Sequence, residues 1–398
     1  MKAWKLPVVA AAAFCSGAYA VEPEGIRAGS GVTLLPTVDL TISDDNNIYS
    51  QDADTTSSLV TRFKPGLGIK ADLGATELTA LYQVEMGQYN EDDNDDYTDQ
   101  LFSVGARSEL NARHELAFAA KLNQAHDARG AGTVEGSAAL TVEDPDEFDE
   151  TSADINYIYG SDTSFLNLDT YAGYYKKEYQ NNEQFGTADR NHDKTKIGAL
   201  LSLNVSSATK ALLEVRSTDI AYDEDSAIAK GREGNELKIL AGASWDVTGK
   251  TTGSVKVGSA ARSFDDSDVD SNTRLSWEAS VVYAPRTYST LTLLSSQNSN
   301  ETNGAGSYIA SDYTAFGWTH TFSPFVSAML DVSLAKDTYV DDAAGRHDEI
   351  LGYGVTGIFS PTKIIDVKAS YKMTNRDSNI DGLDYDRDII SLGFALAI

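Results

Sequence analysis

The segment Thr362–Arg376, "TKIIDVKASYKMTNR", decides the fold, because its polar and apolar side chains alternate. From Ile365 to Met373 every odd-numbered residue is apolar and every even-numbered residue is polar. A period of two residues is that of a β-strand, whose successive side chains point to opposite faces. The continuous apolar face of such a strand must contact either a packed core or lipid.

The same alternation recurs along most of the chain, for example in "TELTALYQVEMGQY" at 76–89 and "NELKILAGASWDV" at 235–247. We count eighteen such segments and predict a strand in each. They cover approximately residues 33–43, 57–72, 76–89, 98–111, 113–126, 150–160, 164–179, 192–205, 208–222, 234–247, 250–264, 273–284, 287–298, 307–322, 324–338, 347–360, 362–376 and 384–398.

The connections between these segments alternate between short turns, such as "LGA" at 73–75, and long, mostly acidic loops, such as "NEDDNDDY" at 90–97. This alternation, with an even number of strands, is typical of outer-membrane barrels, which have short periplasmic turns and longer extracellular loops. The fold class that we predict is therefore all-β: a transmembrane antiparallel up-and-down β-barrel of about 18 strands. Closure of the barrel removes the two open sheet edges. A soluble all-β sandwich or repeat array is the alternative, although no fixed-length repeat is visible.

Two further features bear on the barrel. Pro285, Pro324 and Pro361 fall in proposed turns, where a missing amide donor is harmless, whereas Pro65-Gly66 lies inside a segment and predicts a bulge or a bend. Aromatic residues on the apolar faces fit an interfacial girdle. They are Tyr82, Tyr157, Trp245, Trp277, Tyr283 and Trp318.

The first twenty residues, "MKAWKLPVVAAAAFCSGAYA", have the basic start, apolar centre and small-residue end of a secretory signal peptide. We therefore expect a signal peptide at 1–20, an outer-membrane β-barrel at 21–398, and location in the outer membrane of a Gram-negative bacterium. The only cysteine, Cys15, would be removed with the signal. Removal of Lys2 and Lys5 changes the net charge from -28 to -30, which argues against nucleic acid as a partner.

Alternation places charged side chains of both signs on the face that would line the lumen. We predict thirteen lumen residues. They are Glu85, Arg107, Glu109, Lys121, Asp169, Glu214, Arg216, Lys238, Arg274, Glu278, Asp366, Lys368 and Lys372. These charges either tune which solutes pass or form salt bridges between neighbouring strands.

Motifs for other chemistry are weak. Gly352–Gly357 matches G-x-G-x-x-G, but it lies within an alternating segment and does not open a helix. The acidic runs at 266–270 and 92–96 lack the glycine and glutamate of a calcium-binding EF-hand loop. Loose binding of divalent cations there stays open, and no cofactor, metal site or catalytic residue is predicted.

Several short motifs resemble the β-barrel porin family that is linked to bacterial exopolysaccharide and capsule biosynthesis. They include "DLTISDDNNIYS", "RFKPGLGIKAD", "YQVEMGQYNEDDNDDYTDQ" and "QAHDARGAG", and "GRHDEILGYGVTGIFSPTKIIDVKASYKMTNRDSNIDGLDYDRDIISLGFAL" near the end. The family pattern carries over to Asp45, Asn47, Ile48, Tyr49, Pro65, Gly66, Asp96, Tyr97, Asp99, His126, Asp127, Arg129, Gly130, Arg346, Asp348, Arg376, Asp377, Ser378, Tyr385, Asp386 and Arg387. One departure is the final residue, Ile398, where such barrels usually have an aromatic.

The resemblance implies a non-enzymatic channel that takes part in exopolysaccharide or capsular polysaccharide export or biosynthesis. Its implied partners are outer-membrane lipid, the polysaccharide, a periplasmic polysaccharide-export protein and an envelope synthase complex. A general or substrate-selective porin for small solutes is the main alternative. A hydrolase at the outer rim, using His126 or His347, is a further one.

Overall fold

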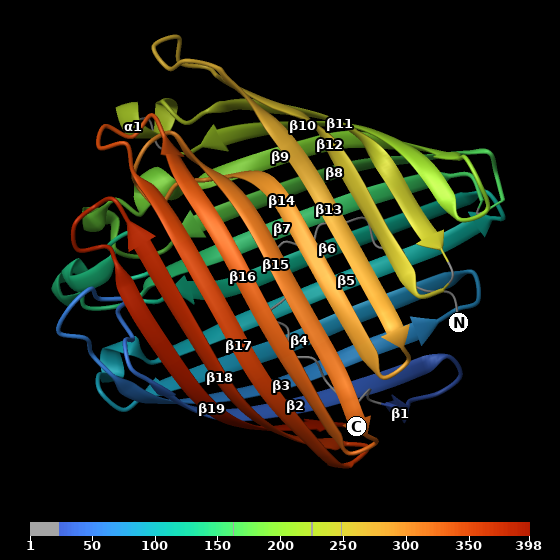
Figure 1. Ribbon diagram of the computed structural model, residues 1–398, viewed down its shortest axis with the longest axis horizontal. Coiled ribbons are helices and arrows are strands. Elements are labelled where there is room, and N and C mark those ends of the chain that lie inside the picture. The colour runs from blue at the N-terminus through green and yellow to red at the C-terminus, as the bar shows by residue number, and fades with distance from the viewer. Residues whose placement is uncertain (1–23, 162, 224–225, 248) are drawn as a thin grey trace.

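The computed structural model describes residues 24–161, 163–223, 226–247 and 249–398. The predicted signal peptide, with Cys15, lies outside these residues. Nearly all regular structure in the described part is β-strand, and the strands form one closed barrel (Figure 1).

Nineteen strands form a single sheet, and without β1 (Ile26–Arg27) eighteen remain in the barrel wall. The wall strands are β2 (Val32–Asp45), β3 (Ser58–Asp72), β4 (Thr76–Tyr89), β5 (Tyr97–Asn111), β6 (His114–Asp127), β7 (Asp146–Tyr159), β8 (Leu166–Tyr179), β9 (His192–Asn204), β10 (Thr209–Tyr222), β11 (Gly234–Val247), β12 (Thr251–Phe264), β13 (Asn272–Arg286), β14 (Ser289–Asn300), β15 (Tyr308–Ser323), β16 (Val326–Val340), β17 (His347–Thr362), β18 (Ile365–Ser378) and β19 (Tyr385–Ala397). Each strand pairs antiparallel with the next, and β19 pairs with β2 to close the barrel. The predicted fold class is confirmed. The unpredicted β1 is only two residues long, which is too short to show a period.

Apolar side chains form continuous rows around the outside of the barrel. One row pairs Leu293 of β14 with Phe316, Phe316 with Val332, and Val332 with Tyr353. Leu293 and Val332 are exposed on this outer face, as expected for the apolar band of such a barrel. Among the described residues, no helix has the length and hydropathy needed to cross a membrane.

Of the bulge or bend predicted at Pro65-Gly66, the structure excludes the bulge. Phe63 pairs with Met86 and Gly66 with Gln83, so the register between β3 and β4 continues unshifted past the proline. The only local change is that the ladder omits Pro65 and its neighbour Lys64, because proline has no amide hydrogen to donate.

Pro36 lies inside β2 and pairs with Leu67 without a register shift, whereas three further prolines lie at strand ends or in a turn. Pro324 is in the turn between β15 and β16. Pro285 and Pro361 are instead the penultimate residues of β13 and β17, beside register shifts. A register shift at a strand end tolerates a missing donor as well as a turn does.

The two ends of the barrel differ. Short turns and both ends of the described chain lie at one end, and the long loops lie at the other (Figure 1). The short helices are all in long loops: the 3₁₀ turns η2 (Asp93–Asp95), η3 (Gly136–Thr141), η4 (Glu183–Phe185) and η5 (Ala188–Arg190), and α1 (Ala227–Lys230). We call the long-loop end the outer mouth.

Candidate functional site: the lumen and its outer mouth

The register places all thirteen predicted lumen residues on the face opposite the exposed apolar rows. Glu214 pairs with Leu240 and Lys256 with Glu278, for example, whereas their strand neighbours Leu213 and Val257 face outward and are exposed. Which of these residues contact a passing solute stays a prediction.

One wall of the lumen carries a dense network of opposite charges. Arg216 Nη1 lies 3.1 Å from Glu278 Oε1, and Lys256 Nζ lies 2.5 Å from Glu278 Oε2. Lys256 also pairs with Glu214, which accepts a 2.6 Å hydrogen bond from the Tyr171 hydroxyl. The four charges come from β10, β12 and β13 and neutralise one another along the wall.

Most of the other predicted lumen residues also have nearby polar partners. The pairs are Glu85–Lys64 at 2.9 Å, Arg107–Glu115 at 2.7 Å, Lys121–Glu150 at 3.4 Å, Lys238–Glu236 at 3.4 Å, Asp169–Asn156 at 2.5 Å and Asp366–Ser360 at 2.5 Å. Arg274 hydrogen-bonds Tyr308, whereas Lys372 is exposed to the lumen. The wall is therefore strongly polar, and many of its charges lie beside an opposite charge.

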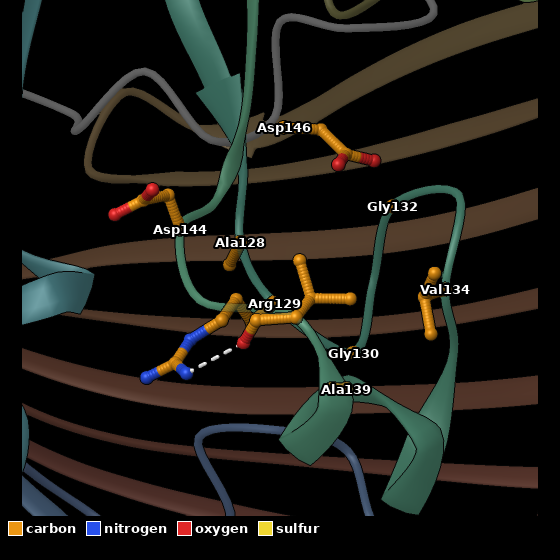
Figure 2. A pocket seen from close by; sticks show the side chains of 9 residues that line it. Ala128, Arg129, Gly130, Gly132, Val134, Ala139, Asp144 and Asp146 are labelled. Atoms are coloured by element: carbon orange, nitrogen blue, oxygen red, sulfur yellow. Dashed lines mark hydrogen bonds between the residues drawn. The ribbon is translucent and has the colours of Figure 1, made fainter. Parts of the chain in front are cut away.

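A long loop between β6 and β7, residues 128–145, folds across the outer mouth; we call it the lid loop. It contacts the loop between β2 and β3, because an added Cβ at Gly130 would lie 1.9 Å from the carbonyl oxygen of Tyr49. Gly130 also has a φ of +84°, so glycine is required there for both reasons. The lid loop encloses a cavity of about 10 Å³, room for about one water molecule (Figure 2).

Arg129 anchors the near side of the lid loop. Its Nε donates to Asp95 at 2.6 Å, and its Nη2 donates to Asp92 at 2.5 Å and to the Tyr49 hydroxyl at 2.6 Å. Arg129, Asp95 and Tyr49 are all buried. Burial, together with the hydrogen bond to Asp95, raises the pKa of Tyr49. The hydrogen bond from Arg129 lowers the pKa of Asp92.

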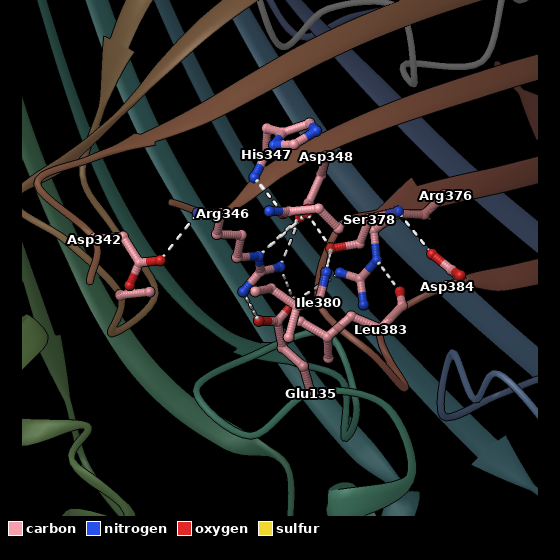
Figure 3. Close-up of polar contacts among 12 residues, drawn as sticks. Glu135, Asp342, Arg346, His347, Asp348, Arg376, Ser378, Ile380, Leu383 and Asp384 are labelled. Atoms are coloured by element: carbon pink, nitrogen blue, oxygen red, sulfur yellow. Dashed lines mark hydrogen bonds and ion pairs between the residues drawn. The ribbon is translucent and has the colours of Figure 1, made fainter. Parts of the chain in front are cut away.

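Glu135 anchors the far side of the lid loop (Figure 3). Its carboxylate accepts hydrogen bonds from Arg346 Nη1 at 2.5 Å and Nη2 at 3.0 Å, and from Arg376 Nη1 at 2.6 Å. Arg346 also donates to Asp348 at 2.6 Å, and Asp348 accepts from the Ser378 hydroxyl at 2.6 Å. Burial alone would raise the pKa of Glu135, but the two guanidinium groups outweigh it and lower that pKa.

Further contacts join the outer loops to one another, and one of them involves the lid loop. Arg190 donates to the Thr133 hydroxyl at 2.6 Å. Arg232 donates to the carbonyl oxygen of Gly304 at 2.9 Å, which links the loops before β11 and before β15. Nearby, Glu301 accepts a 2.6 Å hydrogen bond from Tyr222, and it lies 3.2 Å from Lys194.

The structure gathers most of the residues of the family pattern at this mouth. Tyr49 meets Arg129, Arg346 meets Asp348, and Arg387 meets Asp45 at 2.6 Å. Other positions of the pattern make contacts of their own. Asn47 donates to the carbonyl oxygen of Asp386 at 2.9 Å, and Asp96 accepts from the Tyr89 amide at 2.7 Å. The Tyr97 hydroxyl donates to Glu85 at 2.8 Å, and Asp127 accepts from the Tyr179 hydroxyl at 2.9 Å. The Tyr385 ring lies under Arg376, and Asp377 is exposed.

Sequence reasoning missed the acidic partners. Asp95 and Glu135 complete the two anchors, but each is one carboxylate among many in acidic loops, and no period or motif distinguishes it. Asp92, considered as part of a loose cation site, has Arg129 as its cation.

The structure does not assemble the two histidines of the hydrolase hypothesis into one site. His126 Nδ1 lies 2.9 Å from Asp99 Oδ1, whereas His347 Nδ1 lies 3.4 Å from the carbonyl oxygen of Gly345. In the described part of the chain, no group of three or more His, Cys, Asp or Glu residues is arranged to hold a metal ion. Gly352–Gly357 lies inside β17, with no helix after it to bind a phosphate.

Comparisons with known proteins agree with this architecture. A sequence model of the family described as "Putative beta-barrel porin 2" matches residues 19–398. Among solved structures, OccK2 (OpdF) of Pseudomonas aeruginosa is similar over 92% of this chain and 98% of its own, with 11% identity and a TM-score of 0.50. The FrpB iron transporter of Neisseria meningitidis (F3-3 variant) matches 86% of this chain at 11% identity and a TM-score of 0.47, and the match spans 62% of the transporter. No curated protein matches the chain. At such identities the solved structures bear on the fold alone.

Proposed function

We propose, because this chain belongs to the family described as "Putative beta-barrel porin 2", that it is an outer-membrane channel through which a polysaccharide is exported. In this proposal residues 1–20 are removed as a signal peptide. The periplasmic end, which carries the short turns, would receive the polymer from a periplasmic export protein and an envelope synthase complex.

The observation that carries the proposal is the chemistry of the lumen wall. Many of its charges are paired with one another, as Arg216 is with Glu278 and Lys121 with Glu150. A hydrated glycan can exchange hydrogen bonds with such a wall at every step without meeting one strong charge that would hold it. Passage of a long polymer requires many weak contacts of this kind.

Tyrosines add a second type of weak contact. Tyr171, Tyr175 and Tyr179 recur at every fourth residue on the lumen face of β8, a spacing of roughly 13 Å along the strand. Each hydroxyl donates to a carboxylate: to Glu214 at 2.6 Å, to Glu150 at 2.8 Å and to Asp127 at 2.9 Å, respectively. Tyr171 and Tyr175 are half-buried, so part of each ring remains for contact with the C–H faces of sugars, whereas the Tyr179 ring is buried.

A general porin for small solutes is the second candidate, and the width of the barrel favours it. A wall of eighteen strands is wide enough for an aqueous channel. The same balanced wall would let many small hydrophilic solutes through.

Deletion of the gene distinguishes the two functions. We expect the deletion strain to lose surface polysaccharide and to keep its uptake of small sugars, amino acids and anions, with the polysaccharide restored by a plasmid copy. Unchanged surface polysaccharide together with reduced uptake would reject export and support the general porin.

A further inference from the structure

Two arginines from the ends of adjacent strands converge on one carboxylate at the outer mouth. Arg346 immediately precedes β17, and Arg376 lies near the end of β18. Arg346 contacts both oxygens of Glu135 as a fork, and Arg376 adds a third hydrogen bond to Oε1 (Figure 3). Paired guanidinium groups with fork geometry are a strong recognition site for a carboxylate.

The carboxylate in this site is brought there from far across the mouth. The lid loop begins after β6, and β6, β5, β4, β3, β2, β19, β18 and β17 are consecutive in the wall, so seven steps separate β6 from β17. A barrel of this size is roughly 35 Å wide between strand axes, and seven steps of eighteen span most of that width. The bond from Glu135 to Arg346 therefore holds the lid loop across the opening.

A second observation shows that Glu135 does not use the whole donor capacity of the arginine pair. Arg376 is 7% exposed, and its Nη2 has no hydrogen-bond partner in the described part of the chain. Its Nε donates at 2.6 Å to the carbonyl oxygen of Leu383, and its Nη1 donates to Glu135. A buried guanidinium nitrogen without an acceptor is costly, and a ligand with more oxygens than one carboxylate could satisfy it.

We propose that the Arg346–Arg376 pair is a binding site for the carboxylate of an acidic sugar, and that Glu135 occupies this site while the lid loop is closed. The proposal rests on the proposed function and names its substrate class, an acidic polysaccharide. Glu135 is thus a stand-in for the ligand within the chain.

In this arrangement, binding of the acidic polysaccharide itself favours the open state of the lid loop. A ligand that binds the arginine pair only after Glu135 has left shifts the lid loop towards its open state. Glu135 is tethered and has a high effective concentration, so a single sugar acid competes poorly with it. A chain of acidic sugars presents many carboxylates at once and competes better than a single sugar acid, although the acidic outer loops repel both.

Single-channel recordings of the full chain in a planar lipid bilayer at pH 7 test the proposal. We expect Glu135→Gln to raise the fraction of time spent open by about tenfold or more, because loss of one partner of a buried charge pair is worth at least that factor. Glu143→Gln is the matched control, since Glu143 is an exposed carboxylate of the same lid loop. It should behave as the wild type does.

The ligand part is tested with oligogalacturonate as the acidic probe and maltohexaose as the neutral one. Oligogalacturonate added on the outer-mouth side should raise the opening of the wild type, and galacturonate monomer at equal carboxylate concentration should do so far less. Arg376→Gln should abolish the response to oligogalacturonate. Maltohexaose should leave the opening unchanged.

Two outcomes would overturn the proposal. Equal opening of Glu135→Gln and the wild type would show that the lid loop is not a gate. An open Glu135→Gln channel with a wild type that ignores oligogalacturonate would show that the arginines do not receive a ligand carboxylate. Each variant is first checked for heat-modifiable migration, which reports a folded barrel. Failure of the export proposal is separate, because it is read from surface polysaccharide in cells.

Discussion

At the scale of single residues, arginine organises the outer mouth. Arg129, Arg190, Arg232, Arg346 and Arg376 each join segments that are distant in the sequence. Lysines such as Lys121 and Lys256 pair along the wall instead. A planar guanidinium offers five donors in fixed directions, whereas an ammonium offers a compact charge on a flexible stem. Arginine is therefore better suited than lysine to hold several acceptors from different loops in a fixed geometry.

Arg129→Lys should loosen the lid loop although it keeps the positive charge. Lysine cannot replace the hydrogen bonds that Arg129 makes to Asp95, Tyr49 and the carbonyl oxygen of Val142. We expect local opening of the lid loop to become easier by about 1–3 kcal/mol, the range for lost hydrogen bonds to a charged group. Limited digestion with proteinase K should then cut residues 128–145 faster. Arg113→Lys in an exposed turn is the control, and equal cutting of both variants would contradict the expectation.

The Glu135 anchor should respond to acid. Because the pKa of Glu135 is lowered in the folded protein, its contribution is fully present above the unfolded value of about 4.3. It is lost as the pH falls through the folded pKa, because protonation removes the charge facing Arg346 and Arg376, while Asp348 still faces Arg346. Digestion of the lid loop by pepsin should accelerate steeply below about pH 4. Glu135→Gln should show a flatter pH dependence, and identical profiles would exclude Glu135 as the titrating group.

At the scale of elements, strands could be predicted and loop contacts could not. The segments at 76–89 and 234–247 match β4 and β11 to the residue. A strand between lipid and water has alternating apolar and polar residues, and this period is visible in the sequence. Glu135 and Arg346 are separated by 211 residues, and neither lies in a periodic segment. The family pattern still located Arg129, Arg346 and Arg376, and also Asp348 beside Arg346, but it gave neither Asp95 nor Glu135. The bulge at Pro65 was wrong because a missing donor interrupts a ladder without shifting its register.

Pro65→Thr tests that correction. Threonine restores an amide donor to the ladder between β3 and β4, which favours the folded state by about 0.5–1.5 kcal/mol. It also frees the unfolded chain, which costs about 0.4–1 kcal/mol. We expect the free energy of unfolding, from urea titration in liposomes, to change by less than about 1 kcal/mol. A loss of several kcal/mol would indicate that the proline itself is required in β3.

At the scale of the whole molecule, the barrel wall separates lipid from the lumen. Successive residues of each strand face these two environments in turn. Leu293 faces outward in the apolar row, and the next residue, Leu294, pairs with Ala315 on the lumen face. The same alternation gives a membrane protein whose overall composition is only 41% hydrophobic. Average hydropathy therefore fails to identify such a chain, whereas period and loop lengths succeed.

Leu293→Arg and Leu294→Arg form a matched pair for the orientation of β14. Leu293→Arg should lower the free energy of unfolding by about 2–4 kcal/mol, as a charged residue does near the middle of the lipid face. Leu294→Arg should lower it much less, because this side chain would lie in the polar lumen. Urea unfolding of the two variants in liposomes measures the difference, and equal costs would mean that the faces of β14 are not lipid and water.

The pairing of charges along the wall has an electrical consequence. The chain carries a formal net charge of -28, and its long outer loops are acidic. The electrostatic field that acts on a passing ion is therefore strongest at the outer mouth. Such a pore should prefer potassium over chloride weakly, with a small reversal potential across a salt gradient. The preference should fade as the Debye length shrinks from about 10 Å at 0.1 M salt to about 3 Å at 1 M. A wall lined with unbalanced charge at short range would keep its preference in concentrated salt.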